Sequence, residues 1–394
     1  MPGGFDPQKA LELIQNVIRH DGEFAPLHEP YFTGNENRYV KDCIDTGWVS
    51  SVGSYVDRFE NDLAALHQVP FAIAVVNGTA ALHMCLLLAG TQRDDEILIP
   101  TLTFVATPNA VSYIGAIPHF CDSDERSLGI DAAKLDQQLH EIAEVRDGLC
   151  YNRRTGRVIR AMVAMHCFGH PADLDAILDV ATRWRITLIE DAAESVGSLY
   201  KSKPTGRHAL MSAVSFNGNK IMTTGGGGCI LTEDETLAKR AKHLTTTAKR
   251  PHPYEFDHDE VGYNYRMPNI NAALGVAQIE QLNGFVGAKR QLAKRYQEAF
   301  DGFKGARIFQ DADYATSNYW LMALILDQPD ISIRNEFLEI SNAGGVMTRP
   351  VWELMHHLAI YNDCPRMDLS CAENLEGRII NIPSSVKLGI DNGA

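Results

Sequence analysis

The feature that most constrains the fold is an alternation of short apolar runs with helix-like stretches between Phe71 and about Thr232. FAIAVV, EILIP and RAMVAM have the length of strands and are rich in apolar residues, and a stretch with helical spacing follows each of them. A helix is expected, for example, over AALHMCLLLA, which Gly90 closes. Strands that alternate with helices of about 10–15 residues predict an α/β fold whose central sheet is mostly parallel and buried on both faces.

The chain has 394 residues, which favours one large domain and one smaller domain, at roughly 100–200 residues each. After about residue 250 the polar stretch HPYEFDHDEVGYNYRMPN interrupts the pattern. Helices expected over 270–282 and 286–303 follow it, and then the apolar runs YWLMALIL and RIINIP. We expect residues 1–250 to form a large α/β domain with an N-terminal arm, and residues 251–394 to form a small α+β domain.

Composition and charge exclude several classes of protein. The net charge of −14 argues against nucleic-acid binding as the main task. No apolar stretch approaches 18 residues, and the start shows no secretory signal, so no membrane span or export is expected. Eight cysteines without a CxxC pair are typical of small buried side chains in a reducing cytoplasm. The 14 histidines form no HExxH motif, and no metal is expected.

Polar residues after three of the predicted strands form a set that suits one cofactor. In an open α/β sheet, ligands bind beyond the carboxyl ends of the strands. Gly78 and Thr79 follow one strand and open a helix whose free N–H groups suit a phosphate. Asp191 follows ITLIE, and Lys220 follows AVSF in a stretch with no other charge. Pyridoxal phosphate (PLP) has a phosphate, a ring nitrogen to be kept protonated beside a carboxylate, and an aldehyde that reacts with an amine.

Each of these residues also has an ordinary structural interpretation when it is taken alone. Threonine is a good helix N-cap, and Asp191 could cap a helix or pair with a cation. A lone lysine such as Lys220 is usually solvated at the surface. The four glycines at 225–228 lack the GxxxxGK[ST] pattern of a nucleotide-phosphate loop, and a tight turn with close backbone approach explains them.

Six strings occur in the same order as in the sugar aminotransferases of the DegT/DnrJ/EryC1/StrS family. They are VVNGTAALH, PTLTFVATPNAVSYIGAIPHF, AMHCFGHPADLD, LIEDAAESVGS, SFNGNKIMTTGGGG and GYNYRMPNINAALG. The resemblance spans nearly the whole chain, from about Pro26 to Ser385. It implies the fold-type-I architecture of PLP-dependent transferases, with a large domain on a mostly parallel sheet and a smaller C-terminal α+β domain.

The resemblance also implies a role for each matching residue. Lys220 resembles the lysine that holds PLP as a Schiff base and moves the proton during transamination, and Asp191 resembles the partner of the pyridine nitrogen. Gly78, Thr79 and Ser215 resemble the phosphate ligands. The remaining cofactor contacts implied are Phe104 against the ring face, Glu194 near the ring hydroxyl, and Asn264 at the phosphate.

The implied roles of two of these residues each depend on a further condition. Many members of the family have glutamine where this chain has Glu194, so a carboxyl there needs a proton or an intervening donor. Asn264 resembles a residue that reaches the phosphate from a neighbouring subunit, which implies a homodimer with shared active sites.

One branch of the fold has histidine in place of the lysine and catalyses dehydration, and Lys220 argues against that branch. A PLP-binding regulator without catalysis is a further alternative, and the full set of cofactor residues speaks against it.

The opening segment narrows the expected substrate. FAPLHEPYFTGNENRYVKDCIDTGWVSSVGSYVDRFE resembles a group that aminates nucleotide-linked 4-keto-6-deoxy-N-acetylhexosamines on routes to bacillosamine and legionaminic acid. UDP-4-keto-6-deoxy-N-acetylglucosamine is the preferred acceptor, a GDP-linked sugar is the second, and glutamate, which would become 2-oxoglutarate, is the expected donor. The candidate substrate contacts are Trp48, Ser50, Ser51, His166, Arg349, Trp352 and His356.

Most of these contacts have a second interpretation. Trp48 and Trp352 are also typical packing or interface residues. Arg349 suits a diphosphate or a substrate carboxylate, and a surface salt bridge explains it equally well. His166 is also expected as a structural residue near the site, because a general base has to reach the proton that it takes.

Overall fold

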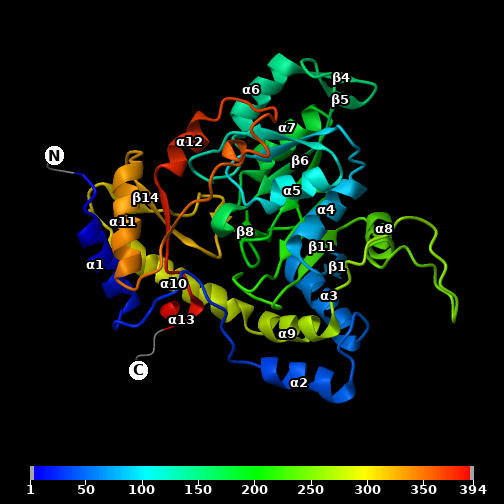
Figure 1. The fold of residues 1–394 in the computed structure, drawn as a ribbon, viewed down its shortest axis with the longest axis horizontal. Coiled ribbons are helices and arrows are strands. Elements are labelled where there is room, and N and C mark those ends of the chain that lie inside the picture. The colour runs from blue at the N-terminus through cyan, green and yellow to red at the C-terminus, as the bar shows by residue number, and fades with distance from the viewer. Residues whose placement is uncertain (1–3, 391–394) are drawn as a thin grey trace.

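In the computed structural model, which describes residues 4–390, two units lie side by side along the long axis (Figure 1). The larger unit is built on a sheet of strand order β1-β11-β10-β7-β6-β2-β3. The strands are β1 (Phe71–Val75), β2 (Glu96–Pro100), β3 (Ile117–Cys121), β6 (Val158–Met165), β7 (Thr187–Asp191), β10 (Met211–Ser215) and β11 (Gly228–Thr232). A hairpin of β4 (Ala143–Arg146) and β5 (Leu149–Asn152) joins the start of β6. All pairs on the main path are parallel except those of β11, so the predicted mostly parallel sheet is confirmed.

Side chains of β1 show why this sheet is buried on both faces. Ile73 and Val75 belong to a core that includes helices α4, α5 and α8. Ala72 and Ala74, which point the other way, belong to a second core with helices α3 and α9. The helices of this unit are α2 (Glu36–Thr46), α3 (Ser54–His67), α4 (Gly78–Leu88), α5 (Ala106–Tyr113), α6 (Ala132–Ile142), α7 (Leu174–Arg183), α8 (Glu235–Thr245) and α9 (Asn269–Ile279).

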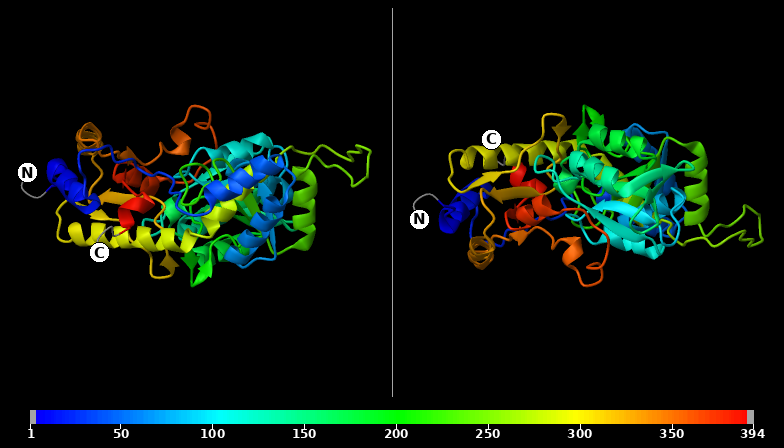
Figure 2. Two further views of the ribbon diagram at one scale, coloured as in Figure 1. Left: turned by 90° about the horizontal axis from the view of Figure 1, so that it is seen from below. Right: turned by 90° about the horizontal axis from the view of Figure 1, so that it is seen from above.

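The smaller unit combines an antiparallel sheet of order β12-β14-β16-β15 with helices from both ends of the chain. The N-terminal helix packs here rather than on the large sheet, because its apolar face, with Leu11 and Ile14, joins a core that contains Phe337. The elements are α1 (Pro7–Ile18), α10 (Leu282–Ala299), β12 (Ala306–Ile308), β14 (Met322–Leu326), α11 (Ile331–Ala343), β15 (Arg349–Pro350), η2 (Met355–His357), α12 (Ser370–Glu376), β16 (Ile379–Ile382) and α13 (Val386–Gly389). Two further views show α1 and α11 at the end of the molecule opposite α8 (Figure 2).

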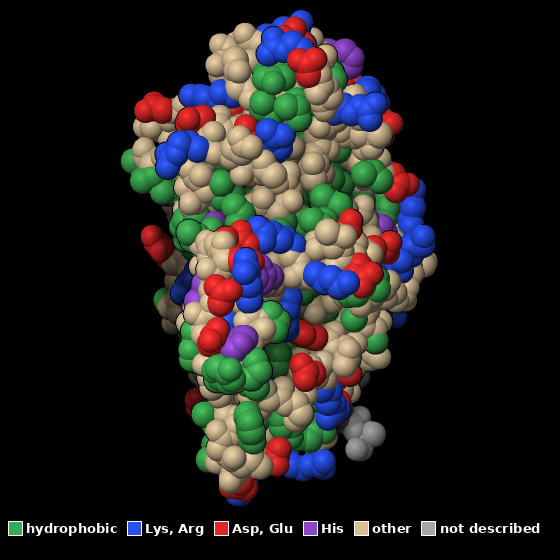
Figure 3. All heavy atoms as spheres, turned by 90° about the vertical axis from the view of Figure 1, so that its right-hand side faces the viewer, with side chains coloured by type: hydrophobic (Ala, Val, Ile, Leu, Met, Phe, Trp, Pro, Cys, Tyr) green, Lys and Arg blue, Asp and Glu red, His purple; other side chains and the backbone are tan. Residues whose placement is uncertain are grey.

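The segment after α8 extends away from the body of the large unit, as the yellow-green loop in Figures 1 and 2 shows. Its apolar side chains are unusually open to solvent: Tyr254 is 79% exposed, Phe256 80% and Val261 84%. The face at this end of the molecule shows green hydrophobic patches among charged side chains (Figure 3). Within residues 4–390, no helix has both the length and the apolar character needed to cross a membrane.

Short elements complete the architecture. The one-turn helix η1 (Cys167–Gly169) follows β6, and a small sheet joins β8 (Leu199–Tyr200), β9 (Lys203–Pro204) and β13 (Ala315–Thr316). The predicted strand at 186–190 is found at 187–191, so Asp191 is the last residue of β7. Met165, Asp191 and Ser215 therefore end three adjacent strands at one edge of the sheet.

Candidate active site

A cavity of about 370 Å³ lies at this edge, where the strands β6, β7 and β10 end. Seven of the eight predicted cofactor contacts line it: Gly78, Thr79, Phe104, Asp191, Glu194, Ser215 and Lys220. Trp352, a predicted substrate contact, lines it as well. The large sheet thus brings residues between Gly78 and Lys220 into one cavity, as expected for strands that end at a common edge, and Trp352 joins them from the smaller unit.

The N-terminus of α4 and the end of β10 form a cradle of backbone donors. Asn77 caps the helix by accepting the N–H of Ala80 at 2.7 Å, which leaves the first N–H groups, those of Gly78 and Thr79, without a helical partner. The backbone of Gly78 packs directly on Ser215, because a Cβ atom at position 78 would lie 2.7 Å from Ser215 Cβ. Free N–H groups, a hydroxyl and the positive end of a helix together suit a phosphate.

Asp191 is a buried carboxyl with neutral partners. One oxygen accepts the hydroxyl of Thr107 at 3.0 Å, and the other accepts the N–H of Ala193 at 3.2 Å. Burial raises the pKa of this carboxyl, and the two hydrogen bonds and Lys220 offset part of the rise. A cationic N–H beside Asp191 would stabilise the ionised form, which is the role that a protonated pyridine nitrogen would have.

Lys220 is held at the cavity by two neighbours of different kinds. Its Nζ lies 3.3 Å from Glu194 Oε1 and 3.9 Å from the ring centroid of Trp320, and its side chain is 12% exposed. The indole N–H of Trp320 donates to the carbonyl of Asn219 at 2.7 Å, so the ring is tied to the loop that carries the lysine. The amine therefore has a defined position, with a carboxyl on one side and an aromatic face on the other.

Glu194 has one fixed oxygen and one that faces Lys220. Oε2 accepts the N–H of Phe168 at 2.8 Å, and Phe168 has a left-handed backbone with φ of 55°. Burial raises the pKa of the Glu194 carboxyl to about 7, even though Lys220 and the Phe168 N–H act against the rise. A carboxyl with this pKa is protonated in a large fraction of molecules at neutral pH. A protonated carboxyl is what position 194 needs if it lies near the ring hydroxyl of PLP.

Aromatic residues enclose the cavity on the side of the smaller unit. Trp352 packs against Phe168 at a centroid distance of 5.0 Å and against Phe104 at 6.3 Å. Trp320, which also lines the cavity, was not among the predicted site residues. Trp320 is 100 positions from Lys220 in the sequence. It lies in an apolar run typical of a strand, so its neighbours in the sequence do not indicate a role at the site.

The structure places most of the predicted substrate contacts away from the cavity. His166 is fully buried, and both ring nitrogens are engaged, one with Glu190 Oε2 at 2.9 Å and the other with the N–H of Ala172 at 3.1 Å. Burial by itself raises the pKa of Glu190, but His166 and the backbone N–H groups around it lower that pKa to about 2. This arrangement favours the structural interpretation of His166.

The other predicted contacts occupy two places. Trp48 and Ser50 lie in the loop between α2 and α3, where their carbonyls accept hydrogen bonds from Asn269, and Ser51 is next to them. Arg349 is exposed on β15 and donates to Asn342 at 2.9 Å. His356 is buried against Thr101, with Nδ1 2.7 Å from the hydroxyl oxygen. None of these five residues lines the cavity of its own chain.

Asn264, the eighth predicted cofactor contact, also lies outside the cavity. It is exposed just after the protruding segment, and its side-chain oxygen accepts a hydrogen bond from Arg266 at 3.4 Å.

Comparisons with known proteins agree with this geometry. Residues 30–392 match the DegT/DnrJ/EryC1/StrS aminotransferase family. The chain is 35% identical to a GDP-perosamine synthase of Escherichia coli O157:H7 over 364 residues, 92% of this chain and 93% of that protein. It is 36% identical to a GDP-perosamine synthase of Caulobacter vibrioides over 362 residues, with 91% and 92% covered. A solved DegT/DnrJ/EryC1/StrS aminotransferase from Brucella abortus is 25% identical, with a TM-score of 0.81 and 89% and 90% of the two chains covered.

Proposed function

The chain belongs to the DegT/DnrJ/EryC1/StrS aminotransferase family, and from that premise we propose that it transfers an amino group from glutamate to C4 of a nucleotide-linked 4-keto-6-deoxy sugar. It is an aminotransferase that acts on nucleotide-linked sugars, and its cofactor is PLP. The observation that carries the proposal is the meeting of a lysine amine, a buried carboxyl and a cradle for phosphate in one cavity.

The residues of the cavity fit PLP part by part. The cradle at Gly78, Thr79 and Ser215 suits the phosphate, because a side chain at position 78 would fill it. Asp191 suits a protonated ring nitrogen, since its own partners are neutral. Phe104, which is 51% exposed and lines the cavity, is available to cover a ring face. Lys220 offers the amine for the aldehyde.

We assign the catalytic steps to residues of this chain as follows. When bound, PLP supplies an electron sink that lets an amino group leave one substrate and enter another. Lys220 Nζ takes the proton from Cα of glutamate and later delivers a proton to C4 of the sugar. Asp191 keeps a negative charge beside the ring nitrogen throughout. Glu194 Oε1 and the face of Trp320 position the amine of Lys220 whenever it is free.

We further propose that the active sites are shared between two copies of the chain. The support is the protruding segment with its exposed Tyr254, Phe256 and Val261, which is followed directly by Asn264. Apolar side chains that are about four-fifths exposed are typical of surfaces that a partner covers. In a shared site, Asn264 would contact the phosphate bound in the neighbouring copy.

For the acceptor we propose UDP-4-keto-6-deoxy-N-acetylglucosamine, with a GDP-linked sugar as the second candidate. The resemblance of the opening segment to enzymes of the bacillosamine and legionaminic acid routes supports the UDP-linked sugar. The names of the E. coli and Caulobacter relatives support the GDP-linked one. We also propose that the protein works in the cytoplasm, because all eight cysteines are free thiols.

The proposal is tested by offering the purified PLP-loaded protein glutamate and the two keto sugars side by side. The expected result is 2-oxoglutarate and an equal amount of a 4-amino sugar, formed with ping-pong kinetics and faster from the UDP-linked acceptor. Faster amination of the GDP-linked sugar would replace the first candidate by the second. A deoxygenated product without transfer of nitrogen would identify a dehydratase and overturn the assignment.

A further inference from the structure

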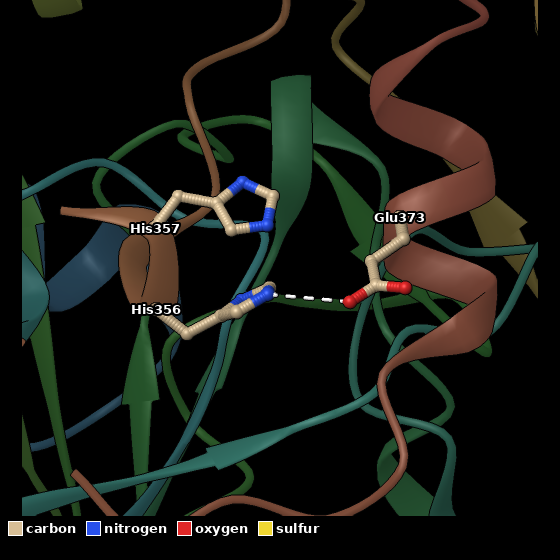
Figure 4. Close-up of side chains that lie close together, drawn as sticks. All are labelled: His356, His357 and Glu373. Carbon is tan, nitrogen blue, oxygen red and sulfur yellow. Dashed lines mark ion pairs between the residues drawn. The ribbon is translucent and has the colours of Figure 1, made fainter. Parts of the chain in front are cut away.

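Two histidines and two carboxylates meet outside the cavity, where η2 faces α12. His356 Nε2 lies 3.4 Å from Glu373 Oε1, and His357 Nδ1 lies 3.6 Å from Glu376 Oε2. One ligand atom from each of His356, His357 and Glu373 lies within 4.8 Å of the other two. Figure 4 shows both imidazole rings extending toward the helix that carries Glu373. The cluster joins two elements that are remote from each other in the sequence.

We propose that His356, His357 and Glu373 bind one divalent transition-metal ion of the class of Zn²⁺. Imidazole nitrogens and carboxylate oxygens are preferred zinc ligands, at bond lengths of about 2.0–2.2 Å. Such bonds place neighbouring ligand atoms of a tetrahedral site roughly 3.4 Å apart, which matches the 3.4 Å between His356 Nε2 and Glu373 Oε1. His357 and Glu373 have side chains that are 40% and 55% exposed, so rotation of either can close the remaining separation.

His356 has the surroundings of a metal ligand that is held in orientation. Its Nδ1 lies 2.7 Å from the hydroxyl of Thr101, which leaves Nε2 directed at Glu373. A histidine that binds a metal usually donates its other ring N–H to an oxygen, and this bond fixes the ring.

A second cluster of the same size provides a comparison. His243, Asp259 and Glu260 also lie within 4.8 Å of one another. Both carboxylates there already have cationic partners, because Glu260 is paired with Arg240 and Asp259 lies 3.3 Å from Arg250 Nε. Over residues 4–390, Glu373 forms no ion pair with a lysine or arginine. Its charge is therefore available to a metal ion, which favours the cluster at η2.

The ion would cross-link the two elements at the smaller-unit wall of the cavity. The N–H of Leu354 already donates to Glu376 Oε1 at 3.1 Å, so η2 and α12 are connected beside the proposed site. Trp352, which lines the cavity, lies two positions before Leu354 in the sequence. Bound metal should therefore stabilise the wall without entering the cavity.

The test is a calorimetric titration of the PLP-loaded enzyme with ZnCl₂. The protein is purified without a polyhistidine tag and freed of metals by dialysis against a chelator. The wild type should bind one ion per chain, and the melting temperature should rise with the Zn²⁺ concentration. The variant His357→Ala, at a partly exposed position, should bind at least about tenfold more weakly. Thr101→Val should cost about 10–100-fold in affinity through the loss of the orienting bond.

Two variants serve as matched controls. His252→Ala removes a histidine that lies 3.8 Å from Glu255 without a third ligand, and it should leave the affinity unchanged. His243→Ala removes the comparison cluster and should also leave it unchanged. Equal Zn²⁺ affinity in wild type and His357→Ala, loss of binding in His243→Ala, or no binding by the wild type would each overturn the proposal.

Discussion

The replacement Glu194→Gln tests whether the site holds a carboxyl that titrates near neutrality. The pKa of Glu194 rises from 4.5 to about 7 because the folded chain buries the group. A difference of about 2.5 pH units, at 1.36 kcal/mol for each, corresponds to about 3 kcal/mol. The folded state prefers the protonated form, so this stability is fully present below pH 4.5 and is lost as the pH rises to about 7.

Glutamine keeps the shape of the side chain and the acceptor for the Phe168 N–H, but it never becomes charged. In the cofactor-free protein, the variant should match the wild type near pH 4.5. It should be more stable by up to about 3 kcal/mol at pH 8. Unfolding by urea at a series of pH values measures the difference, and Glu233→Gln on the surface controls for general effects of pH. A constant difference between wild type and Glu194→Gln over this range would refute the reasoning.

Three further substitutions test other parts of the account. Gly78→Ala places a Cβ 2.7 Å from Ser215 Cβ, and dialysis with radiolabelled PLP should show at least about tenfold weaker binding. Trp320→Leu removes an aromatic face worth about 0.5–2 kcal/mol to the lysine amine, so kcat should fall by about 2–30-fold while Trp320→Phe retains most of the rate. His166→Ala leaves the buried Glu190 without its cationic or donor partner and should lower the free energy of unfolding by about 3–5 kcal/mol in urea titrations.

Local patterns in the sequence were sufficient to predict the mostly parallel sheet, and they placed candidate cofactor residues at the ends of its strands. Asp191 and Lys220 could be singled out because each follows an apolar strand in surroundings that leave a charge unexplained. Parallel strands end at one edge, so the sheet itself brings these residues together. The same reasoning covered Gly78, and the family resemblance added Ser215; the structure shows these two residues in close contact.

Local sequence patterns do not predict the contacts between the two units. Trp320 reaches Lys220 from the smaller unit, and its position depends on how the two units pack rather than on its own neighbours in the chain. The N-terminal helix packs in the smaller unit for the same reason, since an apolar stripe does not specify which core it joins. His356 lies beside His357 and Thr101 and faces Glu373 on α12, and the sequence around His356 does not indicate this contact with a distant helix.

The central claim is that Lys220 holds PLP and uses it for transamination. The most direct test is the absorption spectrum of the purified protein with PLP, recorded before and after glutamate is added, for the wild type and Lys220→Ala. The wild type should show the visible band of lysine-bound PLP and lose it when glutamate delivers its amino group. Lys220→Ala should bind PLP without that band and without turnover. A wild type that stays colourless with added PLP, or a Lys220→Ala variant that aminates the sugar at the wild-type rate, would contradict the account.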